Sequence, residues 1–227
     1  MALSIRNVFL YGFLDTAYLA GRDLVVVTRA LITGGVDILQ LRAKRLSHRE
    51  ITEIARRILP VTRAAGVPLI INDHVEIARH VDAAGVHLGQ EDAHRCSVAA
   101  ARDRLGCGKI IGLSTHSVVQ ARAAEYSRPD YIGFGPLFLT DTKPGRPAIG
   151  LSPVHSLHSS PFSLPVFCIG GINESNLDDV LAAGARRVAI VSAILCAPAL
   201  ATATHRFKQQ LLLKRSNATA CLSGITG

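Results

Sequence analysis

The sequence contains no tryptophan and few aromatic residues of any kind. Only 5% of its 227 residues are aromatic. Proteins that bind single-stranded nucleic acid stack the bases on aromatic side chains. Neither a helix-turn-helix pattern nor a clustered basic face accompanies the few aromatics that are present. These absences argue against a nucleic-acid binder, and we expect no nucleic-acid partner.

Paired cysteines are also missing. The five cysteines are an odd number, and no C-x-x-C pair occurs among Cys96, Cys107, Cys168, Cys196 and Cys221. A disulfide framework or a structural zinc site needs cysteines in regular pairs. The pattern is therefore typical of a reduced, cytoplasmic protein.

No apolar run approaches the roughly 20 residues that cross a bilayer. The apolar start, residues 1–21, superficially resembles a signal peptide, but Asp15 interrupts it. We interpret this segment as the first strand of the fold and expect neither export nor a membrane partner.

Acidic residues are fewer than basic ones. The sequence has 17 Asp and Glu and 25 Lys and Arg, which gives a formal net charge of +8. The basic residues are scattered, with no run longer than two, as at Lys214-Arg215. A solvated basic surface explains most of this excess. The functional alternative is a set of anionic ligands, which requires basic residues at particular sites.

Short apolar runs alternate with longer amphipathic stretches along the chain. This alternation predicts βα units and a parallel sheet. Ser47 and Glu50 form a capping-box pattern that marks one helix start. The strands are expected at residues 8–14, 36–41, 68–72, 85–88, 109–113, 131–134, 165–169 and 187–191.

Eight such units in one chain predict a single-domain α/β fold, a TIM (β/α)₈ barrel over residues 1–213. The Ser-, Thr-, Ala- and Gly-rich segment 214–227 is expected to be a disordered tail. A doubly wound open sheet is the alternative. It requires a Gly-rich loop after the first strand, where Gly12 alone does not suffice.

In such barrels the chemistry lies at the C-terminal ends of the strands. The second strand ends in Gln40, Arg42 and Lys44, which share one side by strand alternation. They would direct one amide and two cations toward a single site. A polar strand-to-helix turn is the alternative interpretation.

Acidic residues follow the next two strands. Asn72-Asp73 ends the third strand, and Asp92 follows the fourth. Carboxylates from neighbouring strand ends can share Mg²⁺, which needs only one or two of them together with a substrate phosphate. Both aspartates could instead be helix caps.

Hydroxyls and one cation follow the fifth and sixth strands. Ser114 could donate a hydrogen bond, and His116 could transfer a proton or be structural. The long loop after the sixth strand carries Thr140, Thr142 and Lys143, which suit phosphate oxygens.

The last two strand ends carry small residues. Gly170-Gly171 and Ser192 occupy the region where many barrels bind a phosphate on backbone N–H groups. The alternative is only a tight turn.

Taken together, these segments resemble the thiamine phosphate synthase family, in its order and spacing, from about Leu10 to Leu212. The segments that carry the resemblance are Q-L-R-A-K, I-I-N-D, G-V-H-L-G-Q-E-D, I-G-L-S-T-H, D-Y-I-G-F-G-P-L-F-L-T-D-T-K, V-F-C-I-G-G-I and V-A-I-V-S-A-I.

The resemblance assigns a ligand to each group of site residues. It implies that the pyrimidine pyrophosphate is bound by Gln40, Arg42, Lys44 and Asn72, with Ser114 and Lys143 on the pyrophosphate side. It implies that Mg²⁺ is held by Asp73 and Asp92. It implies that the thiazole phosphate is seated by Thr140, Thr142, Gly171, Val191 and Ser192.

The implied reaction is a dissociative, Mg-assisted substitution that yields thiamine phosphate and pyrophosphate. Arg42, Lys44, Ser114 and Lys143 would be its catalytic residues, and Cys168 would belong only to the core. Small phosphorylated substrates would be the partners, and a homo-oligomer is compatible with the sequence. The chain departs from the family in Leu14 before Asp15, for which no role is assigned, and in Leu139.

Two other functions share the expected fold. A thiazole tautomerase would use His116 as its base and would not need the acidic pair or the cations. A non-catalytic sensor of phosphorylated ligands would not explain a metal pair beside three cations. Both alternatives are therefore less favoured than the synthase.

Overall fold

The computed structural model describes residues 5–19, 21–90, 96–140 and 145–223. Within them, parallel strands pair in chain order, and β8 pairs with β1 to close a barrel. This closure confirms the (β/α)₈ prediction and excludes the open sheet. The strands are β1 Leu10–Asp15, β2 Ile38–Arg42, β3 Leu69–Asn72, β4 Gly85–Leu88, β5 Ile110–Thr115, β6 Tyr131–Phe134, β7 Val166–Ile169 and β8 Val188–Ala189.

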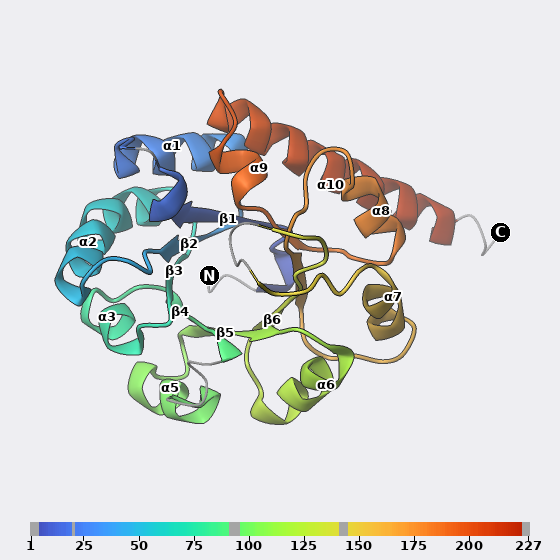
Figure 1. Cartoon of the computed structure of the whole chain (residues 1–227), viewed down its shortest axis with the longest axis horizontal. Coiled ribbons are helices and arrows are strands. Elements are labelled where there is room, and N and C mark those ends of the chain that lie inside the picture. Colours follow the sequence, from blue (N-terminus) through green and yellow to red (C-terminus); the bar gives the residue numbers. More distant parts are fainter. Residues whose placement is uncertain (1–4, 20, 91–95, 141–144, 224–227) are drawn as a thin grey trace.

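Helices form a ring around the strands (Figure 1). They cover the outer face of the barrel, as expected for parallel strands that are buried on both faces. The helices are α1 Leu24–Gly34, α2 His48–Ala64, α3 Val75–His80, α5 Val98–Leu105, α6 Val118–Ser127, α7 Ser152–His158, α8 Leu177–Ala182, α9 Ser192–Leu195 and α10 Leu200–Ser223, with short 3₁₀ turns η1 Ile5–Asn7 and η2 Thr16–Tyr18.

The observed strands match the expected ones with small shifts at their ends. β4 and β6 have the expected bounds, β5 continues to Thr115, and β8 is shorter than expected. The chain leaves β8 early because Val191 already precedes α9. No helix in the described ranges is both long and apolar enough to cross a membrane.

Alternating side chains divide each strand between the barrel interior and the helices. In β2, Gln40 faces a pocket in the barrel interior, whereas Leu41 lies beside Ile51 of α2. In β1, Tyr11 and Phe13 face the same interior. This period of two explains how a mostly apolar strand delivers polar groups to one place.

Aromatic rings fill the centre of the barrel. The Tyr11 ring lies 5.1 Å from Phe13, 5.7 Å from Tyr131 and 5.4 Å from Phe167, measured between centroids. The Tyr131 and Phe167 rings meet edge to face at 5.2 Å. Such rings exclude water and give the pocket a rigid floor.

The capping box predicted at the start of α2 is confirmed. The Ser47 side chain accepts from the backbone N–H of Glu50, and the Glu50 carboxylate accepts from the backbone N–H of Ser47 at 2.8 Å. Both interactions satisfy backbone donors that have no partner within the helix. This local signal was sufficient to place the helix start.

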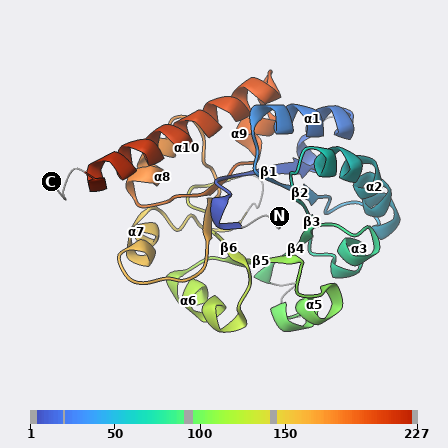
Figure 2. The same ribbon diagram turned by 180° about the vertical axis from the view of Figure 1, so that it is seen from behind.

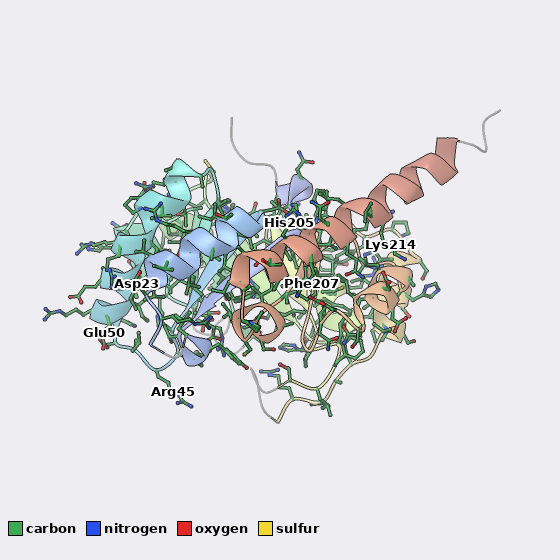
Figure 3. The ribbon with its side chains drawn as sticks, turned by 90° about the horizontal axis from the view of Figure 1, so that it is seen from above. Asp23, Arg45, Glu50, His205, Phe207 and Lys214 are labelled. Atoms are coloured by element: carbon green, nitrogen blue, oxygen red, sulfur yellow. The ribbon has the colours of Figure 1, made fainter. Side chains whose placement is uncertain are left out.

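The end of the chain differs from the predicted disordered tail. Helix α10 continues to Ser223, and residues 224–227 lie outside the described ranges. No Gly or Pro interrupts the sequence from 200 to 223, so nothing in it stops the helix. Figure 3 shows that α10 extends beyond the ring after Lys214.

The N-terminal ends of the strands form the opposite end of the barrel, where η1 lies (Figure 2). There the Asp37 carboxylate accepts from the backbone N–H groups of Phe9 and Leu10, at 2.8 and 2.9 Å, and pairs with Lys208 of α10. These bonds connect β1 to the last helix.

Candidate active site

One pocket opens at the C-terminal ends of the strands and gathers the site residues expected from the sequence. Side chains or backbone from all eight strands or their following loops line it. The expected site residues found in its wall are Gln40, Arg42, Lys44, Asn72, Asp73, Ser114, Thr140, Gly171, Val191 and Ser192. Asp92, Thr142 and Lys143 lie outside the described residues.

Asp73 follows β3 in an unusual backbone conformation, with a φ of 64°. Its backbone N–H donates to the carbonyl of His87 at 2.8 Å, and its Oδ1 accepts from the backbone N–H of Gly89 at 3.2 Å. Asn72 Nδ2 donates to Oδ2. The alternative interpretation of Asp73 as a helix cap is wrong, because α3 begins after His74 and the carboxylate faces the pocket.

Lys44 pairs with this carboxylate. Its Nζ lies 2.9 Å from Asp73 Oδ2, and 48% of the Lys44 side chain is exposed against 11% of the Asp73 side chain. An ammonium this exposed can move toward a ligand at little cost, because a solvent-exposed ion pair contributes little stability. The aspartate is fixed in place, whereas the lysine is adjustable.

Arg42 is held by a residue for which the motifs indicate no role. Its Nη1 donates to Asp15 Oδ2 at 2.5 Å, and the Asp15 side chain is buried with 1% exposure. Asp15 Oδ1 also accepts from the backbone N–H of Ala17. The two residues are direct partners in the pairing of β1 with β2. That register is set only when the barrel closes, so the sequence motifs could not reveal Asp15.

The pocket floor contains further polar groups that the motifs did not single out. Gln40 Nε2 donates to the Tyr11 hydroxyl at 2.8 Å, and the hydroxyls of Tyr11 and Tyr131 lie 2.8 Å apart. His87 Nδ1 lies 3.0 Å from the Tyr131 hydroxyl, and its Nε2 lies 3.0 Å from Ser114 Oγ. The alternation of their strands, each with an apolar neighbour facing outward, could have placed them inside the barrel.

Backbone and small residues form the other wall of the pocket. Gly171 has a φ of 66°, and a Cβ atom there would lie 2.7 Å from the carbonyl oxygen of Leu139. Only glycine therefore lets the segment after β7 approach the segment after β6 this closely. Ser192 begins α9 and lines the same wall.

His116 lies at the pocket edge just after β5. Its backbone N–H donates to Gln120 Oε1 at 2.7 Å, and its Nδ1 is hydrogen-bonded to the carbonyl of Gly135. The bond to Gly135 holds the chain after β6 against the chain after β5, and the bond to Gln120 joins His116 to the start of α6. A structural role thus accounts for the position of His116.

Cys168 is fully buried and is not part of the pocket wall. Burial raises the pKa of its thiol to about 12. The thiolate is the nucleophilic form of cysteine, and it is disfavoured here. This agrees with the expectation that Cys168 belongs only to the core.

The fold and the pocket define an α/β-barrel enzyme whose site combines cations, one fixed carboxylate and a backbone wall suited to phosphate. The family model described as thiamine monophosphate synthase matches residues 10–194. The chain belongs to this family, and it is an enzyme of the transferase class.

Relatives support this assignment over most of the chain. A thiamine-phosphate synthase of Chloroflexus aurantiacus is 40% identical over 92% of this chain and 95% of its own length. One from Clostridium botulinum is 42% identical over 83% and 91%, respectively. The solved structure of a thiamine phosphate pyrophosphorylase from Pyrococcus furiosus is 31% identical, covers 91% of this chain and 96% of that chain, and superposes with a TM-score of 0.80.

Proposed function

We propose that this enzyme condenses 4-amino-2-methyl-5-(diphosphooxymethyl)pyrimidine with a thiazole phosphate, giving thiamine phosphate and pyrophosphate. The observation that carries the proposal is the pocket mouth. There Arg42, Lys44 and Asp73 stand above the polar floor that contains Gln40 and Ser114. Such a site can bind a neutral ring at its base and a highly charged leaving group at its opening.

The chemistry is a substitution in which the bond to the leaving group breaks first. The C–O bond between the pyrimidine methylene carbon and the diphosphate breaks, and its electron pair leaves with the diphosphate. The resulting carbocation then accepts the lone pair of the thiazole nitrogen to form the C–N bond. No proton transfer and no protein nucleophile are needed, in keeping with the buried, protonated Cys168.

The cations stabilise charge that develops on the leaving group. Arg42 is preorganised by Asp15, so its guanidinium does not have to reorganise as the bond breaks. The Lys44 ammonium can move from Asp73 to a diphosphate oxygen because its side chain is half exposed. Lys143 is proposed to act on the same leaving group. The barrel supplies the remaining effect by holding both substrates at reacting distance.

Asp73 fits a role as a magnesium ligand. Its carboxylate lines the pocket and is fixed there by hydrogen bonds from Asn72 and Gly89. Mg²⁺ prefers such hard oxygen ligands and accepts the rest from phosphate and water. When bound, Mg²⁺ would supply Lewis acidity toward the diphosphate. We propose that Asp73 and Asp92 hold it. In the described ranges no group of three or more His, Cys, Asp or Glu gathers around a metal position.

The thiazole phosphate is assigned to the opposite wall. Gly171, Val191 and Ser192 present backbone and a hydroxyl there, and Thr140 lines the same pocket. Backbone N–H groups near a helix start bind phosphate oxygens well. We propose that Thr142 completes this subsite.

The coupling reaction itself tests the proposal. Purified enzyme is given each substrate alone and both together, with Mg²⁺ or with excess chelator, and pyrophosphate and thiamine phosphate are measured. Both products should form in equal amounts, only when the two substrates and the metal are present. Undiminished turnover in excess chelator would refute the metal assignment, and no product under any condition would refute the synthase.

The tautomerase alternative is tested by His116→Ala. Because the His116 ring is engaged with the Gly135 carbonyl, we expect the variant to retain coupling within about tenfold of the wild type, less than the roughly hundredfold or larger loss expected when a proton-transfer group is removed. Complete loss in a variant with an unchanged melting temperature would instead indicate proton transfer. Ser117→Ala, which removes only a helix cap next to His116, serves as the control for local unfolding.

A further inference from the structure

Five polar side chains form a continuous chain of hydrogen bonds across the barrel interior. It runs from Gln40 on β2 through Tyr11 on β1, Tyr131 on β6 and His87 on β4 to Ser114 on β5. The proposed function uses the two ends and leaves the three middle members without a role.

The barrel makes room for this chain at Gly112. A Cβ atom at this position would lie 2.4 Å from the Tyr131 hydroxyl and 2.5 Å from His87 Nδ1. Contacts that short do not occur, so any larger residue would push the Tyr131–His87 hydrogen bond apart. The rings of the two residues also stack at 5.5 Å. The link between Tyr131 and His87 is therefore built into the barrel.

With the Gln40 amide nitrogen as the first donor, the donors and acceptors along the chain are satisfied in only one direction. The Gln40 amide donates to the Tyr11 oxygen, so the Tyr11 hydroxyl proton needs its own acceptor. Among the described residues, the Tyr131 oxygen is the only acceptor bonded to that hydroxyl. The Tyr131 oxygen accepts the proton of the Tyr11 hydroxyl, so the Tyr131 hydroxyl must donate its own proton to another partner. It therefore donates to His87 Nδ1.

The direction then passes through the imidazole. A neutral histidine whose Nδ1 accepts carries its proton on Nε2. His87 Nε2 therefore donates to Ser114 Oγ. The Ser114 hydroxyl keeps its own proton, which it can donate to a ligand in the pocket.

The two phenols of the chain are buried. Burial raises the pKa of both Tyr11 and Tyr131, so each phenol retains its proton. Leaving one of these buried hydroxyls without an acceptor would incur the full desolvation penalty of that group. Reversing one hydrogen bond of the chain leaves such a hydroxyl without an acceptor. The hydrogen bonds of the chain can therefore reverse only all together.

We infer that this directed chain makes the pocket select an amino-substituted pyrimidine over its oxo analogue. The chain leaves the Gln40 amide oxygen as an acceptor at one end and the Ser114 hydroxyl as a donor at the other. His87, Tyr131 and Tyr11 are positioning residues that prevent the Gln40 amide from turning over independently of the rest of the chain. The inference rests on the proposed function, because it concerns the pyrimidine substrate of the same site.

The discrimination follows from opposite hydrogen-bonding patterns. A 4-amino group donates to the Gln40 oxygen, and the Ser114 proton can go to a ring nitrogen or a diphosphate oxygen. A 4-oxo group presents an acceptor, which would meet the amide oxygen and leave both unpaired. A site with buried polar groups of fixed orientation rejects such an analogue strongly. A site whose amide can turn accepts both.

Tyr131→Phe tests the inference by removing one hydroxyl from the middle of the chain. The two halves would then be free to turn independently. kcat/KM is measured with the 4-amino and the 4-oxo pyrimidine diphosphates at saturating thiazole phosphate. We expect the amino-to-oxo ratio to fall by about tenfold or more, as for loss of an orienting hydrogen bond. Tyr126→Phe is the matched control, since Tyr126 is 91% exposed on α6, and its ratio should equal that of the wild type.

The possible outcomes distinguish failure of the directed chain from failure of the proposed function. If the wild type couples the amino substrate but Tyr131→Phe keeps the wild-type ratio, the directed chain is overturned. Equal losses for both analogues would overturn it too, because a merely structural role predicts them. If the wild type couples neither compound, the proposed function fails first. Tyr11→Phe breaks the previous link and replaces Tyr131→Phe if that variant does not fold.

The tautomer of His87 provides a test that needs no activity. Nitrogen-15 NMR of the histidine side chains, with the His87 signals assigned by their absence in His87→Gln, reports which ring nitrogen carries the proton. We expect the proton on Nε2. A proton on Nδ1 would reverse the direction of the chain and overturn the inference.

Discussion

The two ends of the barrel use the same kind of polar contact for different purposes. At the closed end, which the N-terminal ends of the strands form, Asp37 accepts from two backbone N–H groups and pairs with Lys208. At the open end, where the pocket lies, Asp73 accepts from one backbone N–H group and pairs with Lys44. Each site has a carboxylate, backbone donors and a lysine.

The two lysines differ in exposure. The Lys208 side chain is 15% exposed and lies over the Phe9 ring, whereas that of Lys44 is 48% exposed. The ion pair of Lys208 is therefore largely buried within the fold, whereas the Lys44 side chain is exposed enough to contact a ligand. The comparison teaches that the exposure of the partner lysine, rather than the type of contact, distinguishes the carboxylate that stabilises the fold from the one proposed to act in the site.

The largest expected effect breaks the comparison at Asp73. Asp73→Asn should lower kcat by about a hundredfold or more, because it removes the negative charge expected to hold Mg²⁺ at the leaving group. Asparagine tolerates the same left-handed backbone, so the fold should persist. Steady-state coupling rates across a Mg²⁺ titration, together with a melting curve, measure both effects.

Asp82→Asn is the matched control for this variant. Asp82 also has a positive φ, of 55°, but pairs with Arg63 and Lys109 away from the pocket. Its kcat and Mg²⁺ dependence should match those of the wild type. An equal loss of activity in both variants would show that left-handed aspartates matter here only for the fold.

The second prediction concerns Asp15, the carboxylate behind Arg42. Asp15→Asn should reduce kcat/KM by about tenfold to a hundredfold, as expected when a cation loses its fixed orientation near the reacting centre. Competition by inorganic pyrophosphate should weaken in parallel, because the guanidinium is misplaced for that ligand. Inhibition by pyrophosphate with an unchanged constant would show that Asp15 does not position Arg42.

These residues also mark how far the sequence alone could lead. Alternation within β2 placed Gln40, Arg42 and Lys44 on one side, and the pocket contains all three. The barrel followed from repeated apolar runs, because short-range periodicity is written directly in the residues. Local patterns of this kind were sufficient for the strands and for the capping box of α2.

Pairing between distant residues could not be read in the same way. Asp15 meets Arg42, and Tyr11 meets Tyr131, only after the barrel has closed and its register is set. The length of α10 was also missed, because the Ser-, Thr-, Ala- and Gly-rich composition of residues 214–227 was interpreted as disorder although no Gly or Pro occurs before residue 224. Register and three-dimensional closure carry the information that one-dimensional patterns lack.

The third prediction sharpens the comparison at the closed end. Asp37→Asn keeps an acceptor for the backbone of β1 but loses the ion pair with Lys208. We expect a loss of about 1.5–3 kcal/mol in the free energy of unfolding, the range for a hydrogen bond to a charged group. The melting temperature should fall by several degrees, while kcat of the remaining folded enzyme is unchanged. A fall in kcat without a change in melting temperature would place Asp37 in the functional class.

The smallest expected effect is a pH dependence at Asp82. A hydrogen bond from Lys109 lowers the pKa of this carboxyl, with further contributions from the Lys109 and Arg63 charges. Because the pKa is lower in the folded state, the stabilisation is present above the unfolded value of about 3.9 and is lost as the pH falls through the folded value. The Asp82 side chain is 70% exposed, so the contribution should stay under roughly 1 kcal/mol. The melting temperature of Asp82→Asn should therefore lie slightly below that of the wild type at pH 6, and the gap should close as the pH falls through the folded-state pKa of Asp82. A gap that stays constant over this range would show that the Lys109 and Arg63 contacts do not stabilise the fold through the charge of Asp82.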